Sequence, residues 1–125
     1  MAFDVLIADE AFRDLDAISG FIRTKSSIDQ GRKWFDSITA NILSLREMPS
    51  RCSICQESEE LGAEVRVLLH GPKNRTYKIY FTICHDTPRN GTVRVFHIRH
   101  WARNALSTDE LQELMDDLAN EQGEE

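Results

Sequence analysis

The clearest strand pattern in the chain is Tyr77-Lys78-Ile79-Tyr80-Phe81-Thr82-Ile83-Cys84. The apolar residues Tyr77, Ile79, Phe81 and Ile83 alternate with Lys78, Tyr80, Thr82 and Cys84. This is the period of two that a half-buried strand requires. A sheet that buries one face needs a second layer to cover it. The segments on either side of residues 77–84 must therefore supply the other strands and the covering helices.

Two further strands flank this segment. Before it, residues 64–70 place Val65, Val67 and Leu69 on one side and Glu64, Arg66, Leu68 and His70 on the other, and Gly71-Pro72-Lys73-Asn74 supplies a turn. Residues 50–62, which precede this strand, are polar and irregular. After residues 77–84, Asn90-Gly91 predicts another turn, and a strand is expected over residues 92–99.

The burial side of the strand at residues 92–99 stays open. Val93 and Val95 compete with Phe96 and Ile98 for the core side. On the face of the sheet opposite the helices we expect basic and polar side chains, namely Arg66, Lys78, Tyr80 and either Arg94 or Arg99.

The N-terminal part predicts one strand and two helices. Phe3, Val5 and Ile7 alternate, and the period then changes to helical spacing over residues 9–24. Ser27-Ile28-Asp29-Gln30 matches a capping box and opens a second helix, which Pro49 ends. A link of only a few residues makes the two helices an antiparallel hairpin with one shared buried face, and Trp34 is expected to pack in or beside it.

The C-terminal part predicts a last helix. Ser107-Thr108-Asp109-Glu110 is a second capping box, followed by an apolar stripe at Leu111, Leu114, Met115 and Leu118. The element order is therefore β-α-α-β-β-β-α. We predict a two-layer α+β fold in which the helical hairpin packs on an antiparallel-rich sheet, with a main domain at residues 1–106 and an acidic helix and tail at 107–125.

Charge is distributed unevenly along the 125 residues. Of the 21 acidic residues, eight lie from Asp109 onward, where there is no Lys or Arg, which leaves 13 acidic against 15 basic residues and a net charge of +2 before that point. The formal net charge of −6 therefore hides a mildly basic body. Because local potential decides what a surface attracts, the acidic segment could shield this body from an anionic partner, or simply be a solvated helix.

Composition excludes several classes of protein. No apolar run approaches the length of a membrane span, and Met1-Ala2-Phe3-Asp4 lacks the pattern of a secretory signal. Three cysteines fit a reducing compartment better than a disulfide framework. The spacing of Cys52 and Cys55 would need two more ligands to hold zinc, and only Cys84 with His85 offers them, so we expect thiols without a metal and no cofactor. We expect a cytoplasmic protein without a membrane partner.

The chain resembles the RelE/ParE toxin superfamily over roughly residues 2–106. After the helical pair, the resemblance rests on Leu61-Gly62-Ala63-Glu64-Val65-Arg66-Val67-Leu68-Leu69, on Tyr77-Lys78-Ile79-Tyr80-Phe81, and on Val95-Phe96-His97-Ile98-Arg99-His100-Trp101-Ala102-Arg103. It implies a growth-inhibiting toxin of a type II toxin–antitoxin system, held inactive by a cognate antitoxin. Some members cleave mRNA, usually in the ribosome, and others poison DNA gyrase without catalysis. A shared fold does not choose between these activities.

The nuclease hypothesis names two sets of residues. RNA cleavage next to a 2′-hydroxyl needs a base, an acid, and cations for the charged phosphorane. Lys78, His97 and His100 are the candidate catalytic residues, because Lys78 matches a basic sheet position of the family and imidazoles titrate near neutral pH. For binding RNA or phosphate, the candidates are Arg66, Arg99 and Arg103.

Other interpretations of these residues remain open. Alternating Arg and Lys on a half-exposed strand are also typical of a solvated face, and His100 can simply orient a turn. Family nucleases often end in a compact basic or aromatic segment, whereas this chain continues into acidic residues. The alternatives are a gyrase inhibitor that acts through a surface, and a toxin-like protein that has lost its activity and keeps only antitoxin binding.

Overall fold

The strands form one mixed sheet that is covered on one side by a helical hairpin. The computed structural model describes residues 3–55, 58, 64–72, 76–87, 89–100, 112–114 and 116. Its elements are β1 (Phe3–Ile7), α1 (Asp9–Lys25), α2 (Ile28–Leu43), the short 3-10 helices η1 (Ser44–Arg46) and η2 (Pro49–Arg51), β2 (Ser53–Ile54), β3 (Val65–His70), β4 (Tyr77–Thr87) and β5 (Asn90–His100).

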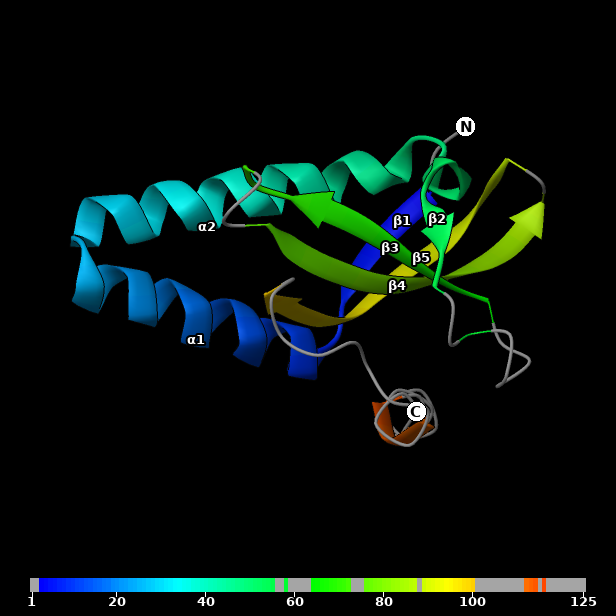
Figure 1. The fold of residues 1–125 in the computed structure, drawn as a ribbon. Coiled ribbons are helices and arrows are strands. Elements are labelled where there is room, and N and C mark those ends of the chain that lie inside the picture. Colours follow the sequence, from blue (N-terminus) through cyan, green and yellow to red (C-terminus); the bar gives the residue numbers. More distant parts are fainter. Residues whose placement is uncertain are drawn as a thin grey trace.

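The strand order is β1-β5-β4-β3-β2, with β1 parallel to β5 and the other neighbours antiparallel (Figure 1). This arrangement confirms the expected α+β fold with a hairpin on an antiparallel-rich sheet. Residues 112–114 are helical. The rest of the predicted C-terminal helix, and most of the segment 107–125, lies outside the described residues. Within the described part of the chain, no helix is long and apolar enough to cross a membrane.

The helical hairpin forms as its sequence pattern predicts, except that α2 ends at Leu43 and not at Pro49, which instead begins η2. Ser27 precedes α2, and its Oγ accepts a hydrogen bond from the backbone N–H of Gln30 at 3.0 Å, which satisfies one of the donors that a helix start leaves open. Leu15, Ile38 and Ile42 are completely buried between the two helices and the sheet. Trp34 packs partly buried against this core, as expected.

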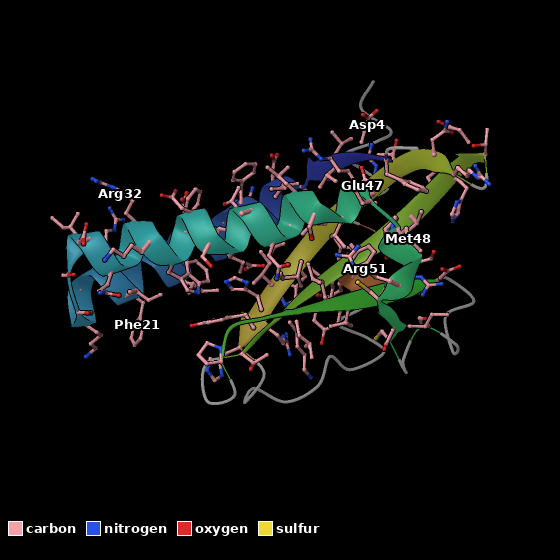
Figure 2. The ribbon with its side chains drawn as sticks, turned by 90° about the horizontal axis from the view of Figure 1, so that it is seen from above. Asp4, Phe21, Arg32, Glu47, Met48 and Arg51 are labelled. Atoms are coloured by element: carbon pink, nitrogen blue, oxygen red, sulfur yellow. The ribbon has the colours of Figure 1, made fainter. Side chains whose placement is uncertain are left out.

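Beyond α2 the chain turns sharply into the edge of the sheet. Met48 adopts a left-handed backbone conformation with φ of 48°, and η2 follows it. The guanidinium of Arg51 donates to the carbonyl oxygens of Glu47, at 2.5 Å, and Met48, at 3.2 Å. These three residues lie together at the end of the helical layer, far from Phe21 at the hairpin end (Figure 2). The turn delivers β2, a two-residue edge strand that was not expected within residues 50–62.

A β-bulge in β5 determines which of its side chains face the helices. Tyr80 pairs with His97 and Phe81 pairs with Val95, so Phe96 is an extra residue. The two residues at such a bulge point to the same side, and alternation resumes beyond it. Val93, Val95 and Ile98 therefore all face the helices, while Phe96 faces the other way. Both expected sets were partly right.

The phase of β3 was predicted wrongly. Leu68 packs against the helix-facing residues, and His70 contacts Asn41 of α2 at 3.0 Å. Arg66 alternates with these side chains and lies on the same side as they do. It is therefore not on the face that carries Lys78, where it had been placed. Val65 and Val67 occupy the opposite side instead.

The turn before β5 also differs from the expectation. Asn90 and Gly91 belong to the strand, and Asn90 already pairs with Thr87. Gly91 has φ of 157°, and a Cβ added there would lie 2.0 Å from the carbonyl oxygen of Cys84. The glycine is thus required by the close approach of the two strands.

Two apolar groups result, one on each side of the sheet. The helix-facing core comprises Phe3, Ala11, Leu15, Ile38, Ile42, Leu45, Cys52, Ile79, Phe81, Val93, Val95 and Ile98. The outer cluster is smaller and comprises Ala8, Cys55, Val65, Tyr80 and Phe96, with Val67 and Leu114 packed against it. The contact of Leu114 places a residue of the acidic C-terminal segment on the outer side of the sheet.

Candidate functional site

The first turns of α1 meet the free edge of β5. β1 pairs with β5 only as far as Val95, and the backbone N–H of Ala8 then donates to the carbonyl oxygen of Val95 at 2.8 Å. From there the chain turns into α1, which contacts β5 along the part that β1 leaves unpaired. Beyond residue 95, this edge of β5 therefore meets a helix and not another strand of the described chain.

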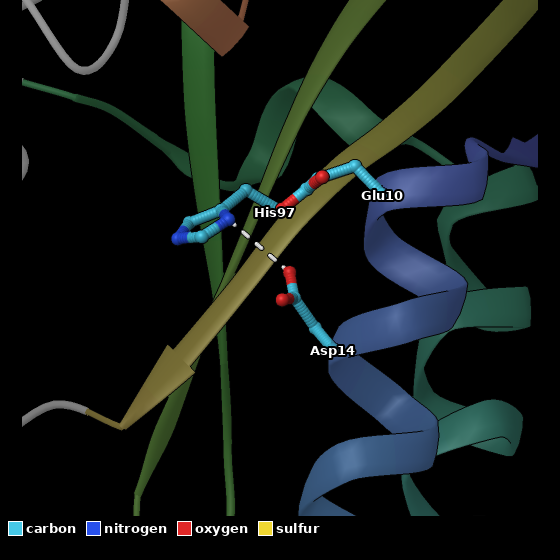
Figure 3. A group of neighbouring side chains, drawn as sticks. All are labelled: Glu10, Asp14 and His97. Atoms are coloured by element: carbon cyan, nitrogen blue, oxygen red, sulfur yellow. Dashed lines mark ion pairs between the residues drawn. The ribbon is translucent and has the colours of Figure 1, made fainter.

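Asp14 of α1 is the residue that satisfies this edge. Its Oδ2 accepts a hydrogen bond from the backbone N–H of Ile98 at 2.9 Å. The same oxygen lies 3.1 Å from Nδ1 of His97, whose side chain is only 9% exposed (Figure 3). Asp14 thus holds the backbone of β5 in place. It also lies beside His97, the one strongly buried histidine among the described residues.

Arg99 completes a buried polar chain with these two residues. Its Nε donates to Nε2 of His97 at 3.1 Å, and its residue exposure is 5%. Because Nε2 accepts this bond, the proton of a neutral His97 ring belongs on Nδ1, on the side of Asp14. Nδ1 nevertheless forms no hydrogen bond with Asp14 or with any other residue that the structure describes.

Lys78 lies next to this chain on the outer side of the sheet. It is the cross-strand neighbour of Arg99, just as Tyr80 is the neighbour of His97, and the rings of Tyr80 and His97 lie 5.9 Å apart. Lys78 is partly buried, and no ion pair with another described residue reaches its ammonium group. The structure thus brings three of the candidate residues together, namely Lys78, His97 and Arg99.

The other candidates are placed elsewhere. Arg66 forms an ion pair with Glu64 at 2.6 Å and donates to the carbonyl oxygens of Ser50 and Cys52, so its guanidinium holds the turn beneath β2. His100 packs edge-on against Tyr77, with ring centroids 5.1 Å apart, on the helix side of β5. There it lines a groove of about 380 Å³ together with Phe21 of α1. Arg103 lies outside the described residues.

Sequence reasoning missed the carboxylates of α1. Glu10, Asp14 and His97 each place one ligand-type atom within 4.8 Å of the others, the single such group of three that the described residues contain. The spacing of Glu10 and Asp14 by four residues puts both on one side of a helix, which was readable from the sequence. That this side faces β5 was not readable, because it depends on where β1 ends.

The cysteines do not form a metal site with one another. Cys52 belongs to the helix-facing core and Cys55 to the outer cluster, so their side chains lie on opposite sides of the sheet. Burial raises the pKa of the Cys52 thiol, although the nearby Arg51 and Arg66 act to lower it. Cys84 is exposed, whereas Cys52 and Cys55 are buried. The Cys52 thiol is thus protonated near neutral pH and unreactive.

Comparison with known proteins identifies the family. A search of curated proteins found no match. The profile of one family, described as the ParE toxin of the type II toxin–antitoxin system parDE, matches residues 5–105. The match begins within β1 and includes both helices of the hairpin and the strands β2 to β5. The chain therefore belongs to the ParE toxin family of type II toxin–antitoxin systems, and an antitoxin partner is implied by that membership.

Proposed function

We propose that this chain is a toxin that binds and inhibits a protein target, DNA gyrase, and does not cleave RNA. The observation that carries the proposal is the Asp14–His97–Arg99 chain. An RNA-cleaving site at this face would need the imidazole of His97 as its base or acid. Nε2 of that imidazole accepts a hydrogen bond from Arg99, and Nδ1 faces Asp14.

The geometry is unfavourable for acid–base catalysis at a phosphodiester. A general base must come within hydrogen-bond reach of the proton that it removes. Nε2 of His97 accepts from Arg99, Nδ1 faces α1, and the residue is 7% exposed. His100, the second candidate, lies on the other side of the strand against Tyr77. The two imidazoles therefore do not flank one substrate position.

One observation favours the alternative, an mRNA interferase. Lys78 and Arg99 are adjacent cations on the outer side of the sheet, and His97 lies beside them. Such a group would suit a phosphate if Arg99 left His97 when RNA bound. The alternative thus requires Arg99 to leave His97, whereas inhibition by binding does not depend on a free imidazole.

The proposed partners follow from this reading. The cognate antitoxin would hold the toxin inactive, and gyrase would be the target once the antitoxin is gone. Both proposed interactions would take place in the bacterial cytoplasm, where gyrase acts on DNA.

Pulse labelling after induction without the antitoxin separates the two activities. We expect DNA synthesis to fall first, with protein synthesis following later. Purified protein should inhibit gyrase supercoiling and leave RNA intact. Lys78→Met should remain toxic, and Lys33→Met, a charge-matched change at an exposed position of α2, serves as its control.

The opposite outcome is equally specific. Early loss of protein synthesis together with cleaved mRNA, both abolished by Lys78→Met and kept by Lys33→Met, would establish the interferase. Growth that continues with neither synthesis reduced would point to a family member that has lost its toxicity.

A further inference from the structure

We propose that Glu10, Asp14 and His97 form a binding site for one divalent transition-metal ion such as Zn²⁺, at the junction of α1 and β5. The three side chains converge from two elements, and their ligand atoms all lie within 4.8 Å of one another (Figure 3). The set of one imidazole and two carboxylates is one that zinc and its neighbours in the first transition row accept. The sequence alone predicts no metal at this junction.

The backbone explains why these groups meet. Glu10 and Asp14 are four residues apart in α1, so their side chains project one above the other from the same side of the helix. The bulge at Phe96 turns His97 to the outer side of β5, next to the edge that α1 covers. Asp14 is held in position by the N–H of Ile98, and its second carboxylate oxygen accepts no hydrogen bond from another described residue.

His97 supplies an observation independent of the acidic pair. Its side chain is 9% exposed, and its Nδ1 is fully buried and points toward the carboxylates, without a hydrogen bond to any described residue. Buried polar atoms are nearly always satisfied, and an orphaned one commonly marks the place of an ordered water or an ion. A cation between Nδ1 and the carboxylates satisfies this atom.

The distances suit an ion of this size. Zinc binds imidazole nitrogen and carboxylate oxygen at about 2.0–2.2 Å, so that neighbouring ligand atoms of a tetrahedral site are about 3.4 Å apart. Nδ1 of His97 and Oδ2 of Asp14 are 3.1 Å apart. Glu10 is partly exposed, and its one ion pair with a described residue is a surface contact of 3.4 Å with Arg13, so its carboxylate can close on the ion and a water can complete the shell.

Arg99 gives the proposal a distinctive signature. A histidine that binds metal through Nδ1 carries its remaining proton on Nε2, and that N–H prefers an acceptor as its partner. Arg99 presents a donor to Nε2 instead. Metal binding therefore displaces Arg99 from His97, and Arg99 weakens the site. Replacing it with an acceptor, as in Arg99→Gln, should strengthen the site.

The test uses the full-length protein freed of metal by a chelator and titrated with Zn²⁺ in a calorimeter. We expect one ion per chain and a rise in Tm on binding. Glu10→Gln should weaken the affinity by about tenfold or more, since it removes a direct ligand while changing only a partly exposed side chain. Asp16→Asn is the matched control, because it removes one charge from an exposed position of the same helix and should bind as the wild type does.

A second readout reports the ligands themselves. Co²⁺ in place of Zn²⁺ should give visible absorption bands that Glu10→Gln and Asp14→Asn alter and Asp16→Asn does not. Arg99→Gln, after its fold has been confirmed by circular dichroism, should bind Zn²⁺ more tightly than the wild type. No saturable binding by the wild type, or equal binding by Glu10→Gln and Asp16→Asn, would overturn the site. Weaker binding by a folded Arg99→Gln would overturn the assignment of Nδ1 as the ligand atom.

Discussion

The two sides of the sheet bury different kinds of side chain. On the helix-covered side, completely buried Leu15, Ile38 and Phe81 belong to a continuous apolar core. On the outer side, a smaller apolar cluster adjoins the polar chain that Asp14, His97 and Arg99 form. Apolar burial stabilises in proportion to area, whereas a buried polar group contributes only when its partners are in place. The apolar core that supplies most of the stability therefore lies on one side of the sheet, and the buried polar residues that need specific partners lie on the other.

The largest effect should come from the helix-facing core. Phe81→Ala removes a ring that is completely buried, and we expect it to lower the free energy of unfolding by about 3–5 kcal/mol. Urea denaturation followed by circular dichroism measures the change. Leu69→Ala, at a position 60% exposed on the neighbouring strand, is the control and should have little effect. Equal losses in the two variants would contradict the assignment of the main core to the helix side.

A smaller loss is expected from the polar chain. Asp14→Ala leaves the backbone N–H of Ile98 without its acceptor and removes the carboxylate beside His97. The cost should be about 1–3 kcal/mol, typical of a polar group that loses its partner. The same unfolding experiment, done with a chelator present so that no metal contributes, measures it.

Asp16→Ala is the matched control for this variant. Asp16 is exposed on the same helix, so its loss should change stability little. If both variants unfolded at the same urea concentration, Asp14 would be a surface acid and the edge of β5 would be held by other groups.

The helix-covered side was largely predictable from the sequence. The capping interaction at Ser27 and the apolar spacing of both helices are local signals, and the alternation within residues 77–84 is a local signal too. These patterns can be recognised in the sequence because each element buries one side only, so its apolar residues recur with the period of the helix or strand.

The outer side could not be predicted to the same depth. The sequence named Lys78, His97 and Arg99 by their residue types, and the structure brings them together. Their partners depend on tertiary features, because a bulge at Phe96 sets the direction of His97 and the end of β1 exposes the edge that Asp14 caps. The prediction of the side of β3 on which Arg66 lies was wrong for a similar reason. Val65 and Val67 belong to the more apolar side of that strand, yet they pack in the outer cluster, so alternation alone does not show which side the helices cover.

The outer cluster offers a third, weaker effect. Leu114 is partly buried against it, so Leu114→Ala should cost about 1 kcal/mol, in keeping with the burial of only part of an apolar side chain. Glu113→Ala, at an exposed neighbouring position, is the control. Hydrogen exchange at Val65 and Val67 measures the change locally and should quicken in Leu114→Ala alone. Unchanged exchange would mean that the C-terminal segment contributes nothing to the outer side.

The smallest effect concerns pH and the helix side. Burial lowers the pKa of His70 from its ordinary value of 6.5. Its Nδ1 lies 3.0 Å from the side-chain amide nitrogen of Asn41, which donates, so a proton on Nδ1 would meet another donor. The unfolded state therefore binds the proton more readily than the folded state does. Stability contributed by neutral His70 is complete above pH 6.5 and is lost as pH falls from there through the lower folded-state pKa.

The variant His70→Gln should remove this part of the acid sensitivity, because a glutamine keeps polar atoms near Asn41 without taking up a proton. We expect the difference in Tm between pH 7.5 and pH 5 to be smaller in His70→Gln than in the wild type. His85→Gln, at an exposed position of β4, should leave that difference as it is. An equal reduction in both variants would trace the acid sensitivity to overall charge and not to the imidazole that is partly buried against α2.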